Sequence, residues 1–296
     1  MKIAFIILNY NGLKVTLECL DSIKRLKIDK SDLEVIVVDN NSNDGSQESL
    51  KKIPDIKLIQ NKENLGYTGG NNAGIKLALR SQAKYLIILN NDTILDPFFL
   101  KNILSVTKEG DIISPKIYFE KGYEFHKDRY TESQLGKIIW YAGGKIDWQN
   151  IIGIHLGVDE VDKGQFFQKK EIDFATGACM LVKKEVFEKI GFFDDKYFLY
   201  LEDMDFSVRA KRVGFKILFQ PNAIIWHKNA ASTGGSGSKL QDYYISRNRL
   251  LFAVKYAKLR TKLAVVRQLI KSSDPVKRKA LVDFLTFKFG KRNHSL

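Results

Sequence analysis

Two kinds of hydrophobic spacing alternate along the first 120 residues of the chain. Short apolar runs, rich in isoleucine and valine, lie at residues 3–8, 34–39, 56–60 and 85–89. Runs of this length are typical of strands that are buried on both faces of a sheet. Between them, apolar residues recur at helical spacing over residues 13–26, and a further helix is expected over 71–80. This alternation predicts an α/β fold in which crossover helices connect parallel strands.

The spacing changes at residue 111. Glycines and aromatic residues are frequent over 111–170 and helical periodicity is weak, so short antiparallel strands and loops are expected there. The pattern then predicts strands at 172–182, 215–219 and 223–227, and helices at 184–190 and 202–213. Residues 233–238 are expected to form a flexible loop. The chain from Leu240 onward is expected to be helical, with an interruption at 272–275.

Polar side chains follow each of the N-terminal strands. They lie at residues 9–12, 39–46, 64–72 and 90–93. The ligand of a parallel sheet lies beyond the carboxyl ends of its strands, so these segments are expected to surround one site. The same residue types also form ordinary turns. Four such segments at one edge nevertheless favour a binding site.

Asp39 and Asp92 stand at the ends of two predicted strands. A carboxylate at Asp39 can accept hydrogen bonds from a ribose or from the N–H of a pyrimidine base. A lone carboxylate such as Asp92 is more often a cap. Beside a diphosphate, however, a divalent cation needs only one or two protein oxygens, because phosphate and water supply the rest. Asp92 is therefore a candidate metal ligand.

Three acids, Glu202, Asp203 and Asp205, follow an aromatic stretch at 197–200. Acids favour the first turn of a helix, so compensation of the helix dipole is one interpretation. Three acids within four residues, behind bulky aromatic side chains, favour a further role, and one of them could act as a general base. His227 ends an apolar strand that could return to the same edge, where a histidine can bind metal. A lone histidine on such a strand is more often structural.

Positive charge is concentrated at the C-terminus. The formal net charge is +14, and residues 255–296 alone hold 12 Lys/Arg and 2 Asp/Glu, a net of +10. Residues 280–289 have an interfacial pattern, so an anionic membrane is one expected partner. Its apolar members are Leu281, Phe284, Leu285, Phe287 and Phe289. A solvated helix pair, a helix packed on the rest of the protein and a partner-binding helix are the alternatives.

Nucleic acid is not expected as a partner, because the aromatic residues do not interleave with the basic ones. Two cysteines, Cys19 and Cys179, cannot form a disulfide framework. This favours a reducing, cytoplasmic location, with peripheral attachment to the cytoplasmic face of a membrane as an option.

Several short blocks occur in a characteristic order. They are residues 6–11 (IILNYN), 37–46 (VVDNNSNDGS), 64–71 (NLGYTGGN), 89–93 (LNNDT), 176–180 (TGACM) and 198–205 (FLYLEDMD). Together they resemble the family-2 glycosyltransferases with the GT-A fold, particularly their rhamnosyltransferase-like branch. The resemblance covers roughly residues 2–250. It rests on the order and spacing of the blocks, since no single block is decisive.

The resemblance implies a Rossmann-like mixed sheet flanked by helices, with a C-terminal helical extension. The GT-A catalytic domain would occupy residues 1–235, with a nucleotide-binding half at about 1–120 and an acceptor half at about 121–235. A basic helical extension would occupy residues 236–296.

The resemblance also implies roles for individual residues. Asp203 would be the general base, with Glu202 beside it, and Asp92 and His227 would bind the metal. Asp92 matches the last acid of the Asp-x-Asp metal motif, whose first acid is replaced here by Asn90. The donor would be bound by Asn9, Asn11, Asp39, Asn41, Gly69, Gly70, Asn71, Asn91 and Arg247.

Within the donor set, Asp39 would contact the base, and the glycines would allow the backbone to approach the donor closely. Arg247 could pair with the diphosphate through its guanidinium. The acceptor candidates come from an aromatic, glycine-rich region at residues 140–157. Its side chains could stack on sugar rings or pack beneath the region; they are Trp140, Tyr141 and Trp148.

These features predict an inverting glycosyltransferase that uses Mg²⁺ or Mn²⁺. It would move a sugar, with rhamnose as a candidate, from a UDP- or dTDP-sugar to a saccharide or lipid-linked acceptor in cell-surface polysaccharide synthesis. The alternatives are a degenerate relative that binds sugar nucleotides without transfer, and a nucleotidyltransferase on a similar sheet. The latter usually has a basic, Gly-rich loop after the first strand, whereas this chain has Asn9-Tyr10-Asn11-Gly12.

Overall fold

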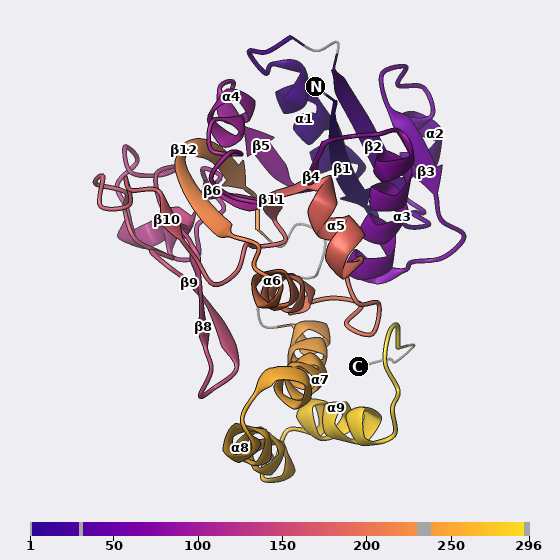
Figure 1. Cartoon of the computed structure of the whole chain (residues 1–296), viewed down its shortest axis with the longest axis vertical. Helices are drawn as coiled ribbons and strands as arrows, with labels where there is room; N and C mark the ends of the chain where they lie inside the picture. Colours follow the sequence, from indigo (N-terminus) through magenta and orange to yellow (C-terminus); the bar gives the residue numbers. More distant parts are fainter. Residues whose placement is uncertain (1, 30–31, 230–237, 293–296) are drawn as a thin grey trace.

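The computed structural model describes residues 2–29, 32–229 and 238–292. Ten of the described strands form one mixed sheet in the order β10-β12-β6-β11-β4-β1-β2-β3, with β5 paired to β12 and β7 paired to β6. Helices flank this sheet, and a group of C-terminal helices lies at one end of the molecule (Figure 1). The predicted α/β class is confirmed.

The four N-terminal strands are parallel, as predicted; they are β1 (Ile3–Asn9), β2 (Leu33–Asp39), β3 (Lys57–Gln60) and β4 (Tyr85–Asn90). Their register sets Asn9 beside Asp39 and Leu8 beside Asn90, so three polar strand ends meet at one edge. Burial on both faces was wrong for β3, which is the outermost strand and has partly exposed side chains.

The helices of the α/β part are α1 (Leu13–Lys24), α2 (Ser46–Leu50), α3 (Gly66–Arg80), α4 (Phe99–Leu104), α5 (Lys184–Ile190) and α6 (Glu202–Arg212). α3 begins earlier than predicted, so it includes part of the expected loop after β3. A Cβ on Gly70 would stand 2.3 Å from Leu8 Cδ1, and one on Gly74 would stand 2.5 Å from Ile6 Cγ2. Glycine at these positions therefore lets α3 pack closely on β1.

The second half of the sheet contains β5 (Thr93–Leu95), β6 (Ile112–Phe119), β7 (Ile139–Tyr141), β10 (Lys170–Glu171), β11 (Cys179–Lys183) and β12 (Ile217–His227). The predicted strand at 172–182 was wrong in its first part, because β11 begins at Cys179. The predicted strands at 215–219 and 223–227 are one strand, interrupted by an irregularity between Gln220 and Ile224. β11 is antiparallel to β4, which makes the sheet mixed.

Between β7 and β11 lies a separate two-stranded sheet of β8 (Gly144–Asp147) and β9 (Ile152–His155). A short 3₁₀ helix, η1 (Lys127–Arg129), precedes β7. These elements confirm the expected short antiparallel strands in this part of the chain. Cys19 and Cys179 are both buried and free.

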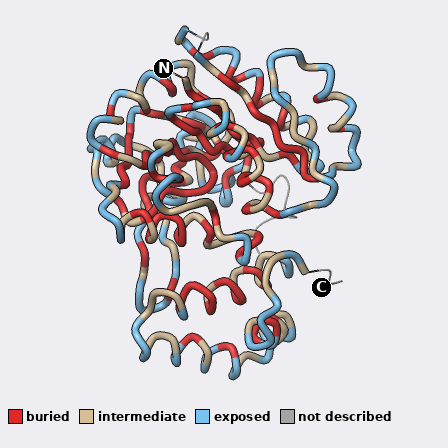
Figure 2. Tube along the Cα trace, turned by 45° about the vertical axis from the view of Figure 1, so that its right-hand side comes forward, coloured by how far each residue is buried: buried red, intermediate tan, exposed pale blue. Residues whose placement is uncertain are grey.

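The C-terminal helices are α7 (Lys239–Tyr256), α8 (Leu259–Ile270) and α9 (Pro275–Leu285). The break between α8 and α9 falls at the predicted place, and the Asp274 carboxylate caps α9 by accepting a hydrogen bond from Val276 N. Buried residues run through the sheet and continue into these helices (Figure 2). Within the described chain, no helix is both long enough and apolar enough to cross a membrane. Most of the expected loop at 233–238, and the domain boundary placed at 235, lie outside the described residues.

Candidate active site

A cavity of about 580 Å³ opens at the carboxyl ends of β1 and β4. Its wall combines the end of β4, the segment before β11, the start of α6 and part of α7. The residues that line it include Tyr67, Asn91, Asp92, Trp140, Gly177, Glu202, Asp203, His227 and Arg249. Both pairs that the sequence assigned to chemistry, Asp92 with His227 and Glu202 with Asp203, therefore line one cavity.

Asp92 and His227 meet because β5 pairs with β12, which sets Thr93 opposite His227. His227 Nε2 lies 3.0 Å from Asp92 Oδ1, and both side chains are buried. The ring of Trp140 packs edge-on against the imidazole, with 4.6 Å between ring centroids. The strand pairing explains how residues 135 positions apart in the chain come into contact.

A carboxylate oxygen and an imidazole nitrogen on the cavity wall suit a divalent cation, and Mn²⁺ accepts both ligand types. Among the described residues, no group of three or more acidic, histidine or cysteine side chains could hold a metal by itself. Asp92 and His227 thus fit a site in which a bound phosphate and water complete the ligand shell.

The Asp203 carboxylate is fixed by two backbone N–H groups. Gly177 N donates to its Oδ2 at 2.9 Å and Met204 N donates to its Oδ1 at 2.8 Å. Burial nevertheless raises the pKa of Asp203. Burial, and then the neighbouring Asp203, raise the pKa of Glu202 well above its usual value. A raised pKa makes a carboxylate a stronger base, so this pair is suited to proton transfer.

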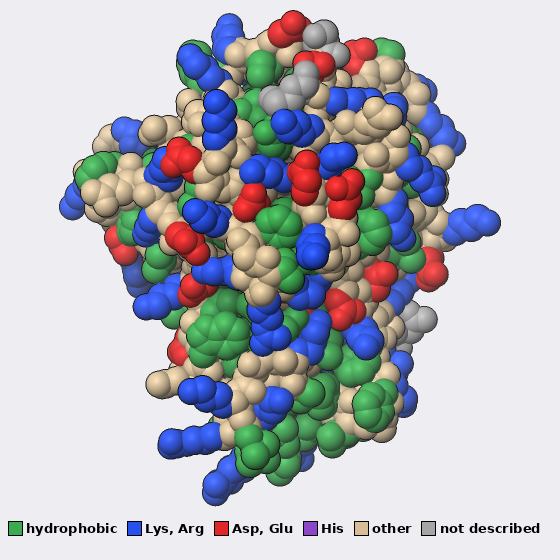
Figure 3. Space-filling model, viewed as in Figure 1, with side chains coloured by type: hydrophobic (Ala, Val, Ile, Leu, Met, Phe, Trp, Pro, Cys, Tyr) green, Lys and Arg blue, Asp and Glu red, His purple; other side chains and the backbone are tan. Residues whose placement is uncertain are grey.

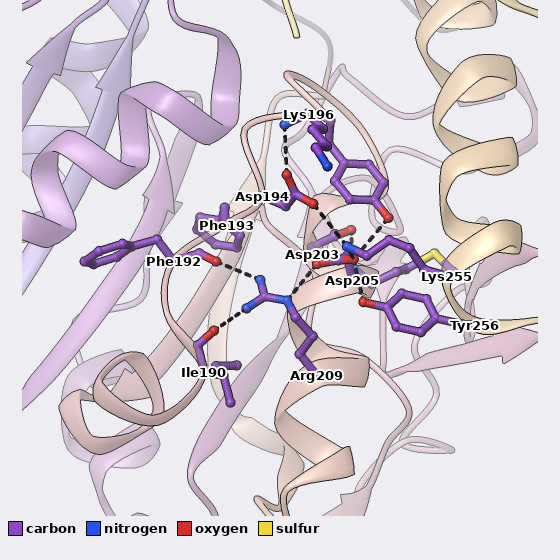
Figure 4. Close-up of polar contacts among 12 residues, drawn as sticks. Ile190, Phe192, Phe193, Asp194, Lys196, Asp203, Asp205, Arg209, Lys255 and Tyr256 are labelled. Atoms are coloured by element: carbon purple, nitrogen blue, oxygen red, sulfur yellow. Dashed lines mark hydrogen bonds and ion pairs between the residues drawn. The ribbon is translucent and has the colours of Figure 1, made fainter. Parts of the chain in front are cut away.

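Asp205 has a different environment from the two acids before it. Arg209 Nε lies 2.8 Å from Asp205 Oδ2, Tyr256 donates to Oδ1 at 2.7 Å, and Lys255 also bonds Oδ1 (Figure 4). Although burial opposes it, the charge of Arg209 and the contacts of Lys255 lower the pKa of Asp205. Asp205 is thus an ionised anchor for α6 inside the protein, and it does not line the cavity.

The residues before Glu202 have an unusual backbone. Phe198, Tyr200 and Leu201 have positive φ values of 65°, 70° and 68°. Side chains of these types rarely adopt this left-handed region, and each instance costs about 1–3 kcal/mol. All three residues line the cavity. The backbone strain is therefore located directly before the first residue of α6.

Asp39 ends β2 and is fully buried. Its carboxylate accepts hydrogen bonds from Asn9 Nδ2 at 2.7 Å, Ser42 N at 3.0 Å and Gln47 Nε2 at 3.0 Å. Thr16 in turn donates to Asn9 Oδ1 at 2.8 Å. Asp39 and Asn9 thus form an internal network that holds the ends of β1 and β2 together, and neither lines the cavity.

The other predicted donor residues are placed variously. Asn91 lines the cavity and donates to Thr16 Oγ1 at 2.8 Å. Asn11 and Asn41 are exposed, have positive φ values of 49° and 64°, and lie outside the cavity wall. Asn71 lies in α3, also away from the cavity, and donates to a backbone carbonyl of its own helix.

The structure does not support a role for the two predicted glycines in approaching the donor. A Cβ on Gly69 would meet Leu65 Cβ at 2.8 Å, and Gly70 faces Leu8, as described above. Neither glycine lines the cavity. The absence of a side chain on these glycines lets Leu65 and Leu8 pack closely against α3.

Arg247 is placed away from the cavity, which corrects the predicted pairing with a diphosphate. Its side chain is fully buried, and its guanidinium donates to the backbone oxygens of Lys196, Tyr197 and Gly290. Arg249, two residues further along α7, lines the cavity instead. No carboxylate of the described residues forms an ion pair with Arg249.

One of the three acceptor candidates lines the cavity. Trp140 does so, whereas Tyr141 is fully buried and donates from its hydroxyl to Phe174 O at 2.7 Å. Trp148 is exposed but belongs to a different hollow beside α6. Tyr141 is therefore a core residue, and Trp148 is not part of this site.

Sequence reasoning missed Tyr67 as a cavity residue. Its hydroxyl donates to Gly177 O at 2.6 Å, and Gly177 N donates to Asp203. The block NLGYTGGN already contained this tyrosine, which directly follows Gly66, the first residue of α3. His155 was missed as well; burial lowers the pKa of this cavity residue to about 4, so its ring is neutral at physiological pH.

Glu202→Gln is expected to raise the melting temperature, and the gain should grow with pH. A carboxyl whose pKa is raised by folding stabilises the folded state below its unfolded pKa and loses this contribution as pH rises through its folded pKa. Glutamine has no charge to bury and escapes this loss. Thermal unfolding of both proteins between pH 5 and 9 measures the difference in melting temperature. Each kcal/mol of stability corresponds to about 2–4 °C.

The matched control is Glu185→Gln, which makes the same exchange at an exposed acid in the first turn of α5. No gain that grows with pH is expected there. A Glu202→Gln gain that stayed constant across the pH range would contradict the assignment of a destabilising buried charge.

The sequence profile described as glycosyl transferase family 2 matches residues 4–191. The chain therefore belongs to glycosyl transferase family 2, and the class that its fold and site define is the GT-A glycosyltransferases. This assignment argues against the nucleotidyltransferase alternative.

Two curated relatives show where this chain lies within the class. The low-salt glycan biosynthesis hexosyltransferase Agl10 of Haloferax volcanii is 27% identical over 221 residues, which cover 74% of this chain and 66% of that protein. The N-acetylglucosaminyl-diphospho-decaprenol L-rhamnosyltransferase of Mycobacterium tuberculosis is 24% identical over 214 residues, 68% of each chain. The chain thus spans about two thirds of the length of these relatives, and the rhamnosyltransferase-like resemblance is confirmed.

A solved structure shows the fold independently. GalNAc-T7, crystallised with UDP, GalNAc and Mn²⁺, superimposes with a TM-score of 0.64 at 16% identity, covering 97% of this chain and 58% of that one. At this identity the likeness concerns the fold. It confirms the predicted GT-A architecture.

Proposed function

We propose that this protein is an inverting glycosyltransferase that transfers a sugar from a nucleotide-diphosphate donor in a single displacement. The observation that carries the proposal is the shared cavity, in which Glu202 and Asp203 face the same space as Asp92 and His227. One pair is suited to take a proton, and the other to hold a cation beside a leaving diphosphate.

In the proposed reaction, Asp203 removes the proton from an acceptor hydroxyl as that oxygen attacks the anomeric carbon of the donor. The two N–H groups on its carboxylate fix the orientation of the base. The bond from the anomeric carbon to the diphosphate breaks on the opposite side, so the configuration inverts. When bound at Asp92 and His227, Mg²⁺ or Mn²⁺ would neutralise the negative charge of the diphosphate.

The donor that we propose is a UDP- or dTDP-sugar, and the acceptor is a saccharide or a lipid-linked saccharide. The UDP of GalNAc-T7 and the diphospho-decaprenol in the name of the mycobacterial relative support these classes. Arg249 takes the place of Arg247 as the guanidinium available to a phosphate, because it lines the cavity.

A donor-hydrolysis screen tests this function. UDP- and dTDP-linked hexoses and deoxyhexoses are incubated with the protein and Mn²⁺ or Mg²⁺, and release of the nucleotide diphosphate is followed. At least one donor is expected to be hydrolysed slowly, and the rate should rise on addition of acceptor. Binding of a nucleotide sugar without any release would instead support the degenerate, sugar-nucleotide-binding alternative.

We also propose that α8 and α9 dock on an anionic membrane surface. α8 exposes Leu259, Leu263 and Ile270, and the end of α9 exposes Leu285 and Phe287, the last with 82% of its surface accessible. Figure 3 shows hydrophobic side chains interspersed with Lys and Arg over the end of the molecule that these helices form. The net charge of +10 over residues 255–296 complements anionic lipid.

The structure changes which side chains this surface contains. Leu281 is buried, and Phe284 and Phe289 pack against the core, so three of the five residues expected at an interface face inward. α8, which the sequence did not single out, supplies exposed leucines in their place. The exposed pair, Leu285 and Phe287, lies at the C-terminal end of α9 and just beyond it.

Vesicle flotation measures this docking. The wild-type protein is expected to float with vesicles that contain anionic lipid and to remain behind with neutral vesicles. Leu263→Glu combined with Phe287→Glu should lower the floated fraction severalfold, because charged side chains oppose insertion at the interface. Phe167→Glu, at an exposed aromatic elsewhere, is the matched control. Equal flotation of the double variant and wild type would remove the membrane proposal.

A further inference from the structure

The segment 196–201 connects the core to the catalytic helix α6 and contains the three left-handed residues described above. None of them is glycine, so the local sequence does not favour this conformation. Such a backbone persists only where surrounding contacts impose it. Two elements, α7 and α3, make hydrogen bonds to the segment.

From α7, the side-chain amide of Asn248 donates to three carbonyls of the segment. Nδ2 lies 2.9 Å from Tyr197 O, 2.7 Å from Leu199 O and 2.9 Å from Tyr200 O. Arg247 donates to Asn248 Oδ1 at 2.9 Å, and only an amide oxygen can accept that bond. The carbonyls and the guanidinium together fix which end of the fully buried Asn248 amide faces the segment.

Arg247 holds the beginning of the same segment. Its Nη2 donates to Lys196 O at 3.0 Å and to Tyr197 O at 2.9 Å. Its Nη1 donates to Gly290 O at 2.8 Å, and Gly290 N donates back to Lys196 O at 3.0 Å. The chain that follows α9 is thereby tied to the segment before α6.

From α3, two backbone N–H groups fix the middle of the segment. Tyr67 N and Thr68 N donate to Phe198 O at 2.7 Å and 3.3 Å. Tyr67 also bonds Gly177 O through its hydroxyl, and Gly177 N holds Asp203. Farther along α7, Lys255 and Tyr256 hold Asp205 of α6 (Figure 4).

We infer that Arg247 and Asn248 are positioning residues, which impose the left-handed course of residues 196–201 and so set the orientation of Glu202 and Asp203. The C-terminal helices are then part of the catalytic unit, and their role exceeds that of an appended anchor. The catalytic consequence rests on the proposed function. The structural consequence, an ordered segment 196–204 that depends on α7, does not.

Asn248→Asp tests the inference with the smallest change of shape. The carboxylate still accepts from Arg247, but it donates nothing to the three carbonyls and repels them. We expect kcat to fall about 10- to 100-fold with the donor KM changed less than threefold, because a displaced base affects turnover more than binding. Arg247→Lys, which keeps the charge but loses the planar fork, should give a smaller loss of the same kind.

Hydrogen–deuterium exchange gives a readout that does not require activity. Asn248→Asp should speed exchange of amides in residues 198–204 at least tenfold, while β1 and β2 remain unchanged. Val265→Ala, which removes buried volume from α8, is the matched destabilised control. It should lower the melting temperature without accelerating exchange in 198–204.

Wild-type exchange over 198–204 in Asn248→Asp would overturn the inference, whatever the activity. The inference would also be overturned if Val265→Ala lost as much melting temperature as Asn248→Asp and its kcat fell by the same factor. Accelerated exchange in a protein that transfers no sugar from any donor would leave the support of the segment established and refute the proposed function instead. If Asn248→Asp does not fold, Arg247→Lys is subjected to the same comparisons.

Discussion

Asp203→Asn is expected to lower kcat about 10²–10⁴-fold while donor affinity stays close to that of the wild type. A carboxamide cannot take the proton of an acceptor hydroxyl. It has nearly the shape of the carboxylate and keeps an oxygen that can accept the N–H of Gly177 or Met204. Initial rates at saturating acceptor, together with donor titration by calorimetry, separate the two effects.

Glu202→Gln distinguishes the roles of the adjacent acids. If Asp203 is the base, Glu202→Gln should leave the acid limb of the kcat profile near its wild-type pH. Burial raises the pKa of Asp203, and the pKa of Glu202 is raised further, so Glu202 still carries its proton while Asp203 titrates. Turnover should change far less than in Asp203→Asn. A folded Asp203→Asn enzyme with near-native turnover would refute the assignment, and loss of donor binding alone would assign a binding role.

The residues that sequence reasoning placed correctly are those whose position follows from strand ends. Asp92 stands after β4 and His227 ends β12, and in a sheet of this topology both ends meet the same cavity. The pattern of apolar residues predicts such strand ends, because an apolar run stops where the strand stops. The expectation that both bind one metal came from the family resemblance, because β5, whose pairing with β12 sets Thr93 opposite His227, was not among the predicted strands.

Two residues that it placed wrongly, Arg247 and Tyr141, have partners that are backbone atoms remote in sequence. Arg247 lies in a segment where a guanidinium could meet a phosphate or a carbonyl equally well. Its actual partners, such as Tyr197 O, are 50 positions away. The left-handed conformation of the residues before Glu202 could not be predicted from the sequence either. Phenylalanine, tyrosine and leucine favour other conformations, and only tertiary hydrogen bonds override that preference.

Asp39 illustrates an intermediate case. The sequence placed it at the correct edge of the sheet, but the protein groups that donate to it come from the end of β1, the loop after β2 and α2, and their number could not be read from the sequence. With Asn9, Ser42 and Gln47 already bonded to its oxygens, Asp39 sets the shape of the strand ends. Contact with a nucleotide base remains a prediction for this residue.

Removal of divalent metal is expected to abolish most turnover. Chelation should lower the rate about 10²–10³-fold, and Mn²⁺ or Mg²⁺ should restore it. The reason is that a cation that neutralises the leaving diphosphate lowers the activation barrier substantially. His227→Asn should weaken Mn²⁺ binding in the presence of UDP, measured by calorimetry, since an amide is a poorer ligand than imidazole for this ion. Full activity after exhaustive chelation would contradict a metal at Asp92 and His227. The matched control is His126→Asn, at an exposed histidine paired with Asp159 and absent from the cavity wall, which should leave Mn²⁺ binding unchanged.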